Sequence, residues 1–147
     1  MIQRIPREQR VYSFWSQHPP VARVTPGASV VLETCDCYDG QVSLDAQPPS
    51  DAGVDRTRTN PATGPVFVEG AMPGDTLVVD IVRVEMLERG IVIGADSRWY
   101  SREAFVLAVA NGMAQLPGGL SRPVDPVVGV IGVAPVGEPV RNSHPGD

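Results

Sequence analysis

The sequence predicts an all-β domain, a sandwich or barrel of short strands. Three observations favour this class: Val-rich runs of strand length, Pro and Gly residues that punctuate them, and the near absence of helix start and stop signals. The chain has 147 residues, enough for one domain that buries roughly 68–70% of its unfolded surface. We therefore expect a single domain over residues 1–147.

Two stretches of the sequence resemble each other and predict the same local structure. Residues 25–34 and 72–81 each contain Pro-Gly, then a hydroxyl residue, three aliphatic residues and a carboxylate. Pro-Gly fits a type II turn, because Gly supplies the positive φ. A short apolar run precedes each stretch, so we expect two similar hairpin-like units. Their predicted strands are 21–24, 29–35, 65–69 and 76–86.

The second half of the chain contains two more strand signals. Residues 105–110 fit a helix or a strand by pattern, but Asn111-Gly112 favours a type I′ turn and hence a hairpin over 105–116. The apolar run 127–134 predicts a strand buried on both faces, where Gly129 and Gly132 allow close backbone approach. Residues 45–64 are polar and lack periodicity, which predicts a long loop.

Charge and hydropathy exclude several functional classes. The net charge is −5, and all 12 basic residues are Arg without clustering, so nucleic-acid binding is not expected. No apolar run approaches the ~18 residues of a membrane span, so no membrane partner is expected. The first residues lack a signal-peptide core, which makes the cytoplasm the expected location.

The two cysteines are predicted to be free thiols. Cys35 and Cys37 are two residues apart, which in a strand places their Cα atoms nearly 7 Å apart, beyond the usual disulfide range. Two small buried hydrophobic residues are the simpler interpretation, and a nucleophile or a metal ligand is the alternative.

Several segments of the chain resemble the acetamidase/formamidase family. The most specific is the string Asn-Pro-Ala-Thr-Gly-Pro-Val-Phe-Val-Glu-Gly-Ala at 60–71, followed by Pro-Gly-Asp at 73–75. The similarity extends in the same order from about residue 12 to 147. The other segments that carry it are 18–21, 36–42 and 129–135.

The resemblance implies an activity, a fold and a set of partners. It implies hydrolysis of a short amide such as formamide or acetamide to a carboxylate and ammonia, a jelly-roll-like β-sandwich of short antiparallel strands, and a divalent metal, Zn or Ca. Members of the family are about twice this length, so the resemblance covers their N-terminal half. We therefore expect a homo-oligomer or a second chain that supplies the C-terminal half. The alternative functions are a non-catalytic β-sandwich binding or assembly module and a metal-binding structural protein.

Candidate site residues follow from this resemblance and from their places at strand ends. Amide hydrolysis needs an activated nucleophile, charge stabilisation at the carbonyl oxygen and a proton for the leaving ammonia. Each candidate also has a structural interpretation, as a solvated strand end, a turn residue or a packing His. The assignments are Glu69 and Asp36 as catalytic residues, Asn60 and Gly64 as substrate-binding residues, and Asp39 and His18 as metal ligands.

Overall fold

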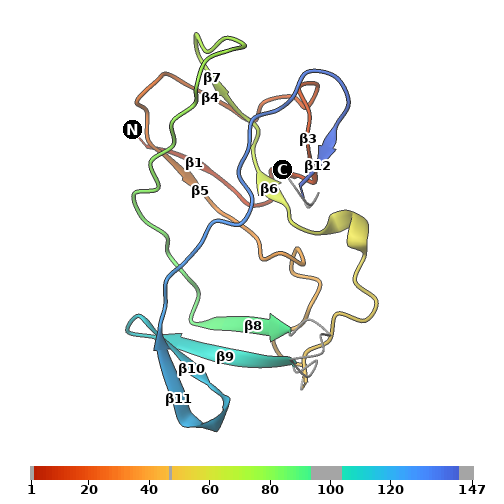
Figure 1. Ribbon diagram of the computed structural model, residues 1–147, viewed down its shortest axis with the longest axis vertical. Helices are drawn as coiled ribbons and strands as arrows, with labels where there is room; N and C mark the ends of the chain where they lie inside the picture. Colours follow the sequence, from red (N-terminus) through yellow and green to blue (C-terminus); the bar gives the residue numbers. More distant parts are fainter. Residues whose placement is uncertain (1, 47, 94–103, 143–147) are drawn as a thin grey trace. The chain divides into compact units, whose positions relative to one another are not determined.

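The structure is a computed structural model that describes residues 2–46, 48–93 and 104–142. Its regular elements are short strands and two 3₁₀ helices, so the predicted all-β class is confirmed. The strands are β1 (Gln3–Ile5), β2 (Arg10–Val11), β3 (Ser13–Phe14), β4 (Ala22–Val24), β5 (Val30–Leu32), β6 (Ala62–Thr63), β7 (Val66–Val68), β8 (Arg89–Ile93), β9 (Ala104–Ala110), β10 (Met113–Leu116), β11 (Leu120–Pro123) and β12 (Val140–Arg141). The 3₁₀ helices are η1 (Arg56–Arg58) and η2 (Pro117–Gly119) (Figure 1).

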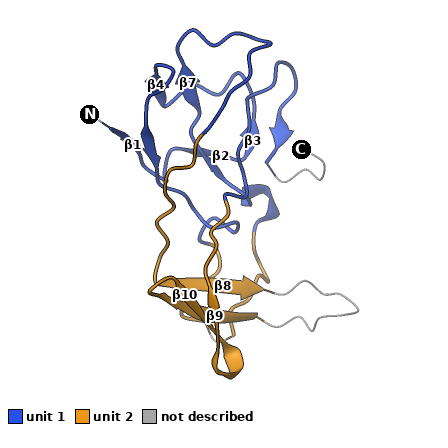
Figure 2. Ribbon diagram, turned by 60° about the vertical axis from the view of Figure 1, so that its left-hand side comes forward, with its two compact units in different colours: residues 1–40, 55–79, 128–147 blue, residues 41–54, 80–127 orange. Residues whose placement is uncertain are grey.

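The chain divides into two compact units, shown in Figure 2. Unit 1 comprises Met1–Gly40, Asp55–Val79 and Val128–Asp147, and unit 2 comprises Gln41–Val54 and Asp80–Val127. The segment 45–64, predicted as a long loop, contains η1 and β6 among its described residues.

Unit 1 is built from four two-stranded pairs. The pairs β2–β6 and β3–β12 are antiparallel, whereas β1–β5 and β4–β7 are parallel. The two hairpin-like units are therefore a wrong prediction. β4, the strand before the first Pro-Gly turn, does not pair within its own predicted hairpin. It pairs with β7, the strand before the second Pro-Gly turn, in the register Ala22↔Val66. Ile5 and Ala22 are the buried apolar side chains of this unit.

Unit 2 contains a four-stranded antiparallel sheet in the order β11-β10-β9-β8. The predicted hairpin over 105–116 is confirmed, because β9 pairs with β10 and both turn residues have positive φ, 50° at Asn111 and 73° at Gly112. These are the angles of the type I′ turn that Asn-Gly favours. Arg89 of β8 donates hydrogen bonds to the segment at residues 44–45 of the same unit. One goes to the Asp45 carboxylate (3.1 Å) and one to the Leu44 carbonyl.

Two predicted strands are not formed among the described residues. Residues 76–86 and 127–134 have no regular secondary structure, although both runs are rich in Val (Figure 1). Their backbones make no backbone–backbone hydrogen bond within the part of the chain that the structure describes. A strand requires a partner as well as a suitable sequence, and neither run has one there.

The close approach expected at residues 127–134 occurs at Gly132. A Cβ atom on Gly132 would lie 3.0 Å from the ring of Phe14, whereas one on Gly129 would meet nothing within 4 Å. We expect Gly132→Ala to destabilise the fold by about 1–3 kcal/mol through overpacking, and Gly129→Ala to be neutral or slightly stabilising. Urea unfolding curves of the two variants test this. Equal midpoints would show that Phe14 does not limit residue 132.

Candidate functional site

A turn over residues 36–40 directs the side chain of Asp39 into unit 1. The Asp36 carboxylate accepts hydrogen bonds from the backbone N–H groups of Tyr38 (2.7 Å) and Gly40 (3.0 Å). The Asp39 N–H donates to the Asp36 carbonyl at 3.0 Å, and Asp39 has φ 57°. Such side-chain bonds are how an Asp stabilises a turn in which a later residue has positive φ. The Asp39 side chain is fully buried as a result.

Three side chains from separate parts of unit 1 converge on the Asp39 carboxylate. Its Oδ2 atom accepts hydrogen bonds from the Tyr12 hydroxyl (2.7 Å), Arg58 Nη2 (2.8 Å) and Arg10 Nη2 (3.2 Å). Arg10 lies in β2, Tyr12 follows it, and Arg58 ends η1. We call these four residues, Arg10, Tyr12, Asp39 and Arg58, the Asp39 cluster.

The charges of the Asp39 cluster keep the carboxylate ionised. Burial acts to raise the pKa of Asp39, but the hydrogen bonds from Tyr12, Arg10 and Arg58 outweigh it and hold the pKa below its ordinary value. The bond to Asp39 likewise raises the pKa of Arg10 above its ordinary value. With two guanidinium groups and one carboxylate, the cluster carries a net positive charge at neutral pH. It is suited to stabilising negative charge and not to donating a proton.

Two buried oxygens beside these residues accept no hydrogen bond within the described structure. Oδ1 of Asp39 lies 2.6 Å from Arg10 Nε, but that N–H donates to the Tyr12 hydroxyl (3.2 Å). Oδ1 of Asn142 is the second. Its amide orientation is fixed, because Nδ2 donates to the carbonyls of Val11 (2.9 Å) and Asn60 (3.0 Å). The positive charge of Arg10 compensates Asp39 Oδ1, so Asn142 Oδ1 is the buried acceptor of this site that has no described partner, which is an uncommon feature.

Both predicted substrate-binding residues act in the structure through their backbones. Asn60 has φ 52°, donates its N–H to the Cys37 carbonyl (2.8 Å) and accepts the bond from Asn142. Gly64 has φ 139° and donates its N–H to the Gln9 carbonyl at 2.9 Å. A φ of 139° strains any residue with a side chain, so this position favours Gly, and a Cβ atom there would also lie 3.3 Å from the Val66 nitrogen.

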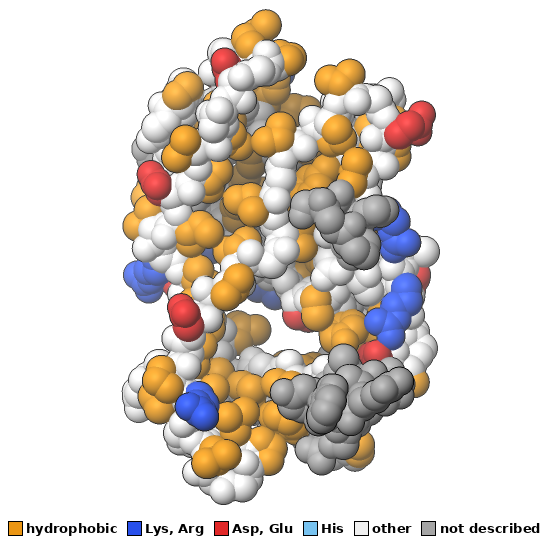
Figure 3. Space-filling model, in the orientation of Figure 1, with side chains coloured by type: hydrophobic (Ala, Val, Ile, Leu, Met, Phe, Trp, Pro, Cys, Tyr) orange, Lys and Arg blue, Asp and Glu red, His pale blue; other side chains and the backbone are white. Residues whose placement is uncertain are grey.

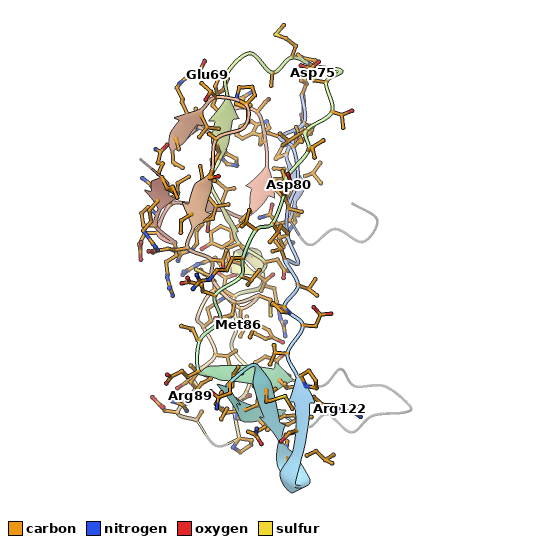
Figure 4. All side chains as sticks on the ribbon, turned by 90° about the vertical axis from the view of Figure 1, so that its left-hand side faces the viewer. Glu69, Asp75, Asp80, Met86, Arg89 and Arg122 are labelled. Atoms are coloured by element: carbon orange, nitrogen blue, oxygen red, sulfur yellow. The ribbon has the colours of Figure 1, made fainter. Side chains whose placement is uncertain are left out.

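The structure places Glu69 and His18 elsewhere in unit 1. Glu69 lies at the end of β7 (Figure 4), where its half-exposed side chain forms a 3.2 Å ion pair with Arg23. The guanidinium of Arg23 also lies 4.1 Å from the centre of the Phe67 ring. His18 Nε2 is 3.2 Å from Ser13 Oγ, and its ring meets Trp15 edge-on at 5.6 Å. No hydrogen bond or ion pair of the described residues joins either side chain to the Asp39 cluster.

The surroundings of Asp39 do not fit a metal ligand. Two guanidinium groups already face its carboxylate and would repel a metal cation placed beside them. Within the described ranges, no three His, Cys, Asp or Glu side chains form a group that could hold a metal ion. The divalent metal stays a prediction.

Sequence reasoning missed the residues that complete this site: Arg10, Tyr12, Arg58 and Asn142. One signal was present, because Arg10 and Tyr12 alternate around Val11 and so point to the same side of a strand. Arg58 lies in the polar segment 45–64, and Asn142 follows the last described strand. Only the packing of distant parts of the chain brings these two residues to the site around Asp39.

The sequence matches the Acetamidase/Formamidase family over residues 3–142. The chain belongs to this family. Formamidase from Methylophilus methylotrophus is 33% identical over 94 residues, which are 63% of this chain and 21% of that protein. Acetamidase from Mycolicibacterium smegmatis is 35% identical over 81 residues, 53% of this chain and 20% of that protein.

Solved structures resemble the whole chain. The acetamidase from Bacillus halodurans is 32% identical with a TM-score of 0.88, and the match covers 97% of this chain and 50% of that one. A recombinant predicted acetamidase/formamidase from Thermoanaerobacter tengcongensis is also 32% identical, with a TM-score of 0.87, covering 99% and 50%. The chain thus spans half the length of these structures, and its match spans about a fifth of the curated family members.

No helix in the described ranges combines the length and the apolarity that a membrane crossing requires.

Proposed function

We propose that this chain forms half of an enzyme that hydrolyses short aliphatic amides of the formamide and acetamide type to a carboxylate and ammonia. The observation that carries the proposal is the family match over residues 3–142. Similarity to relatives named formamidase and acetamidase supports the reaction type. The other half of the enzyme corresponds to the part of the solved relatives that this chain does not cover.

The Asp39 cluster supplies charge stabilisation in this proposal. Attack on an amide carbon places negative charge on the carbonyl oxygen, and fixed positive groups lower the energy of that state. The side chain of Arg58 is half exposed, and its Nη2 lies 2.8 Å from Asp39 Oδ2, which orients the positive guanidinium at the cluster. Asp39 is then a positioning residue, and Asp36 positions Asp39 by holding the turn.

Glu69 remains the candidate for the general base. Its place on a strand end suits a group that must be positioned within ~0.5 Å. The Asp39 cluster cannot take this role easily, since the carboxylate of Asp39 already accepts bonds from three donors. A cytoplasmic location and a homo-oligomeric state stay predictions.

A chimera tests the role of Glu69. It joins this chain to the half of the Bacillus halodurans acetamidase that the chain does not match. We expect Glu69→Gln to lower ammonia release by the chimera about 10²-fold or more, the scale of a lost general base. Glu33→Gln is the matched control, because Glu33 also pairs with an Arg across the strand pair, at 3.1 Å from Arg4. Near-normal turnover of Glu69→Gln would leave Glu69 as a solvated strand end.

The thiols are expected to be dispensable for this reaction. Both cysteines are free in the structure, and burial raises the pKa of Cys35 and of Cys37 above the ordinary value, which disfavours the nucleophilic thiolate. Cys35→Ser and Cys37→Ser chimeras should retain activity, and a thiol reagent should titrate two free groups per chain, since the sequence has two Cys. A folded but inactive serine variant would point to a thiol nucleophile.

The alternative, a non-catalytic β-sandwich module, makes the opposite prediction for the chimera. In that case the chimera would fold with its two halves associated, but it would release no ammonia.

A further inference from the structure

The two similar stretches of sequence form the same turn. Gly27 and Gly74 have φ 80° and 100°, and each turn is closed by an equivalent bond, from Ala28 N–H to the Thr25 carbonyl (3.1 Å) and from Asp75 N–H to the Met72 carbonyl (3.0 Å). The strands before the turns, β4 and β7, pair with each other. Unit 1 therefore contains two related strand–turn arrangements, and the second has three more residues, 69–71, between its strand and its turn.

The two copies differ after the turn. In the first copy, residues 30–32 form β5, which pairs in parallel with β1. The equivalent residues of the second copy, Leu77, Val78 and Val79, have no strand partner among the described residues, and they are 51%, 78% and 51% exposed. Figure 3 shows hydrophobic side chains at many places on the visible surface. A Val-rich run with an unpaired backbone is a template for another strand.

We propose that residues 77–79 are a vacant strand edge, and that a strand from the half of the family fold absent from this chain adds to it in parallel, as β1 adds to β5. The solved relatives are twice as long as this chain and match nearly all of it, so their remaining half is available to provide such a strand. Apolar segments that are exposed here become buried when that strand is added.

The copy with β1 shows which backbone groups the added strand would meet. The Glu33 N–H donates to the Ile5 carbonyl at 3.0 Å, so Glu33 directs its backbone toward β1. Backbone directions alternate along a strand, so Val31 faces the same way and its neighbours face away. The equivalent of Val31 is Val78. Its N–H is expected to face the added strand, whereas the N–H of Val79 is expected to face away.

A second copy of this chain is the alternative occupant, because each strand of a two-stranded sheet, β1 included, has one partner and keeps one edge without a strand partner among the described residues. We favour the missing half because the solved relatives carry it in the same polypeptide as the part that matches this chain. The proposal concerns association and does not depend on catalysis, so failure of ammonia release would leave it standing.

The test mixes this chain with the uncovered half of the Bacillus halodurans acetamidase as a separate polypeptide. Size-exclusion chromatography with light scattering measures complex formation, and hydrogen exchange measures protection of the backbone at 76–80. We expect a 1:1 complex in which the Val78 amide becomes protected. Val78→Pro should weaken the complex about tenfold, because Pro removes the N–H that faces the added strand. Val79→Pro is the matched control and should weaken it far less.

Four results would overturn the proposal. They are the absence of a complex, a complex without protection at residues 76–80, equal effects of the two Pro variants, and a homodimer of this chain in which Val78 is protected. A side-chain substitution elsewhere separates strand addition from nonspecific hydrophobic association. Leu120→Arg changes an exposed apolar residue in β11, which already has a partner, and should leave the complex unchanged.

Discussion

Replacing Asp39 with Asn is expected to lower the free energy of unfolding by about 2–3 kcal/mol. The substitution keeps the shape of the side chain but removes the negative charge that two guanidinium groups face. Removing one partner of a buried ion pair costs about 3–5 kcal/mol when the remaining charge is fully buried. The expected loss is smaller here, because the side chains of Arg10 and Arg58 are partly exposed and water can solvate them.

Asp45→Asn is the matched control for this substitution. Asp45 also pairs with an Arg, at 3.1 Å from Arg89, but its side chain is almost fully exposed. Such surface pairs contribute about 0–1 kcal/mol. Urea unfolding followed by tryptophan fluorescence compares the variants. If Asp39→Asn were no more destabilising than Asp45→Asn, the Asp39 cluster would not hold unit 1 together.

The contribution of Asp39 to stability should also depend on pH. The folded-state pKa of Asp39 lies below that of the unfolded chain, which is about 3.9. The contribution is therefore fully present above about pH 4 and is lost as the pH falls through the lower folded-state value. The difference in stability between the natural chain and Asp39→Asn should be constant from pH 5 to 7 and shrink below pH 4. A difference that grew on acidification would contradict the lowered pKa.

Local signals in the sequence predicted the elements whose structure is decided locally. Asn111-Gly112 predicted its hairpin because two positive φ angles are needed there, and the Pro-Gly pairs predicted the turns at Gly27 and Gly74. The strands at 30–32 and 66–68 also formed within their predicted ranges.

The strand partners and the side chains that gather around Asp39 could not be predicted, because both depend on residues far apart in the chain. Residues 76–86 have a stronger strand pattern than 30–32, but only the latter finds a partner within the described chain. The Asp39 cluster joins a turn, a strand and a 3₁₀ helix, and nothing in the local sequence of Arg58 indicates that it reaches Asp39. The turn signal at Tyr38-Asp39-Gly40 indicated a side chain bonded to nearby backbone, but it pointed to Asp39, whereas in the structure Asp36 has this role and Asp39 is buried in the cluster.

The chain alone is expected to show no amide hydrolysis, whereas the chimera is expected to release ammonia from formamide or acetamide. Amide bonds are poor electrophiles, so charge stabilisation without an activated nucleophile and a proton donor is insufficient. In this account the Asp39 cluster supplies charge stabilisation and Glu69 is the general base, and the absent half supplies the proton donor and completes the site around them. Without that half, ammonia release is expected to fall to the background of the assay, a larger effect than any single substitution proposed above.

The most direct test of this account is the rate of ammonia release from formamide and acetamide, measured in parallel for the purified 147-residue chain and for the chimera. An Arg58→Ala chimera serves as a folded control with weakened charge stabilisation. We expect release by the chimera, reduced release by its Arg58→Ala variant and none by the chain alone. Robust release by the chain alone, or none by a folded chimera, would contradict it.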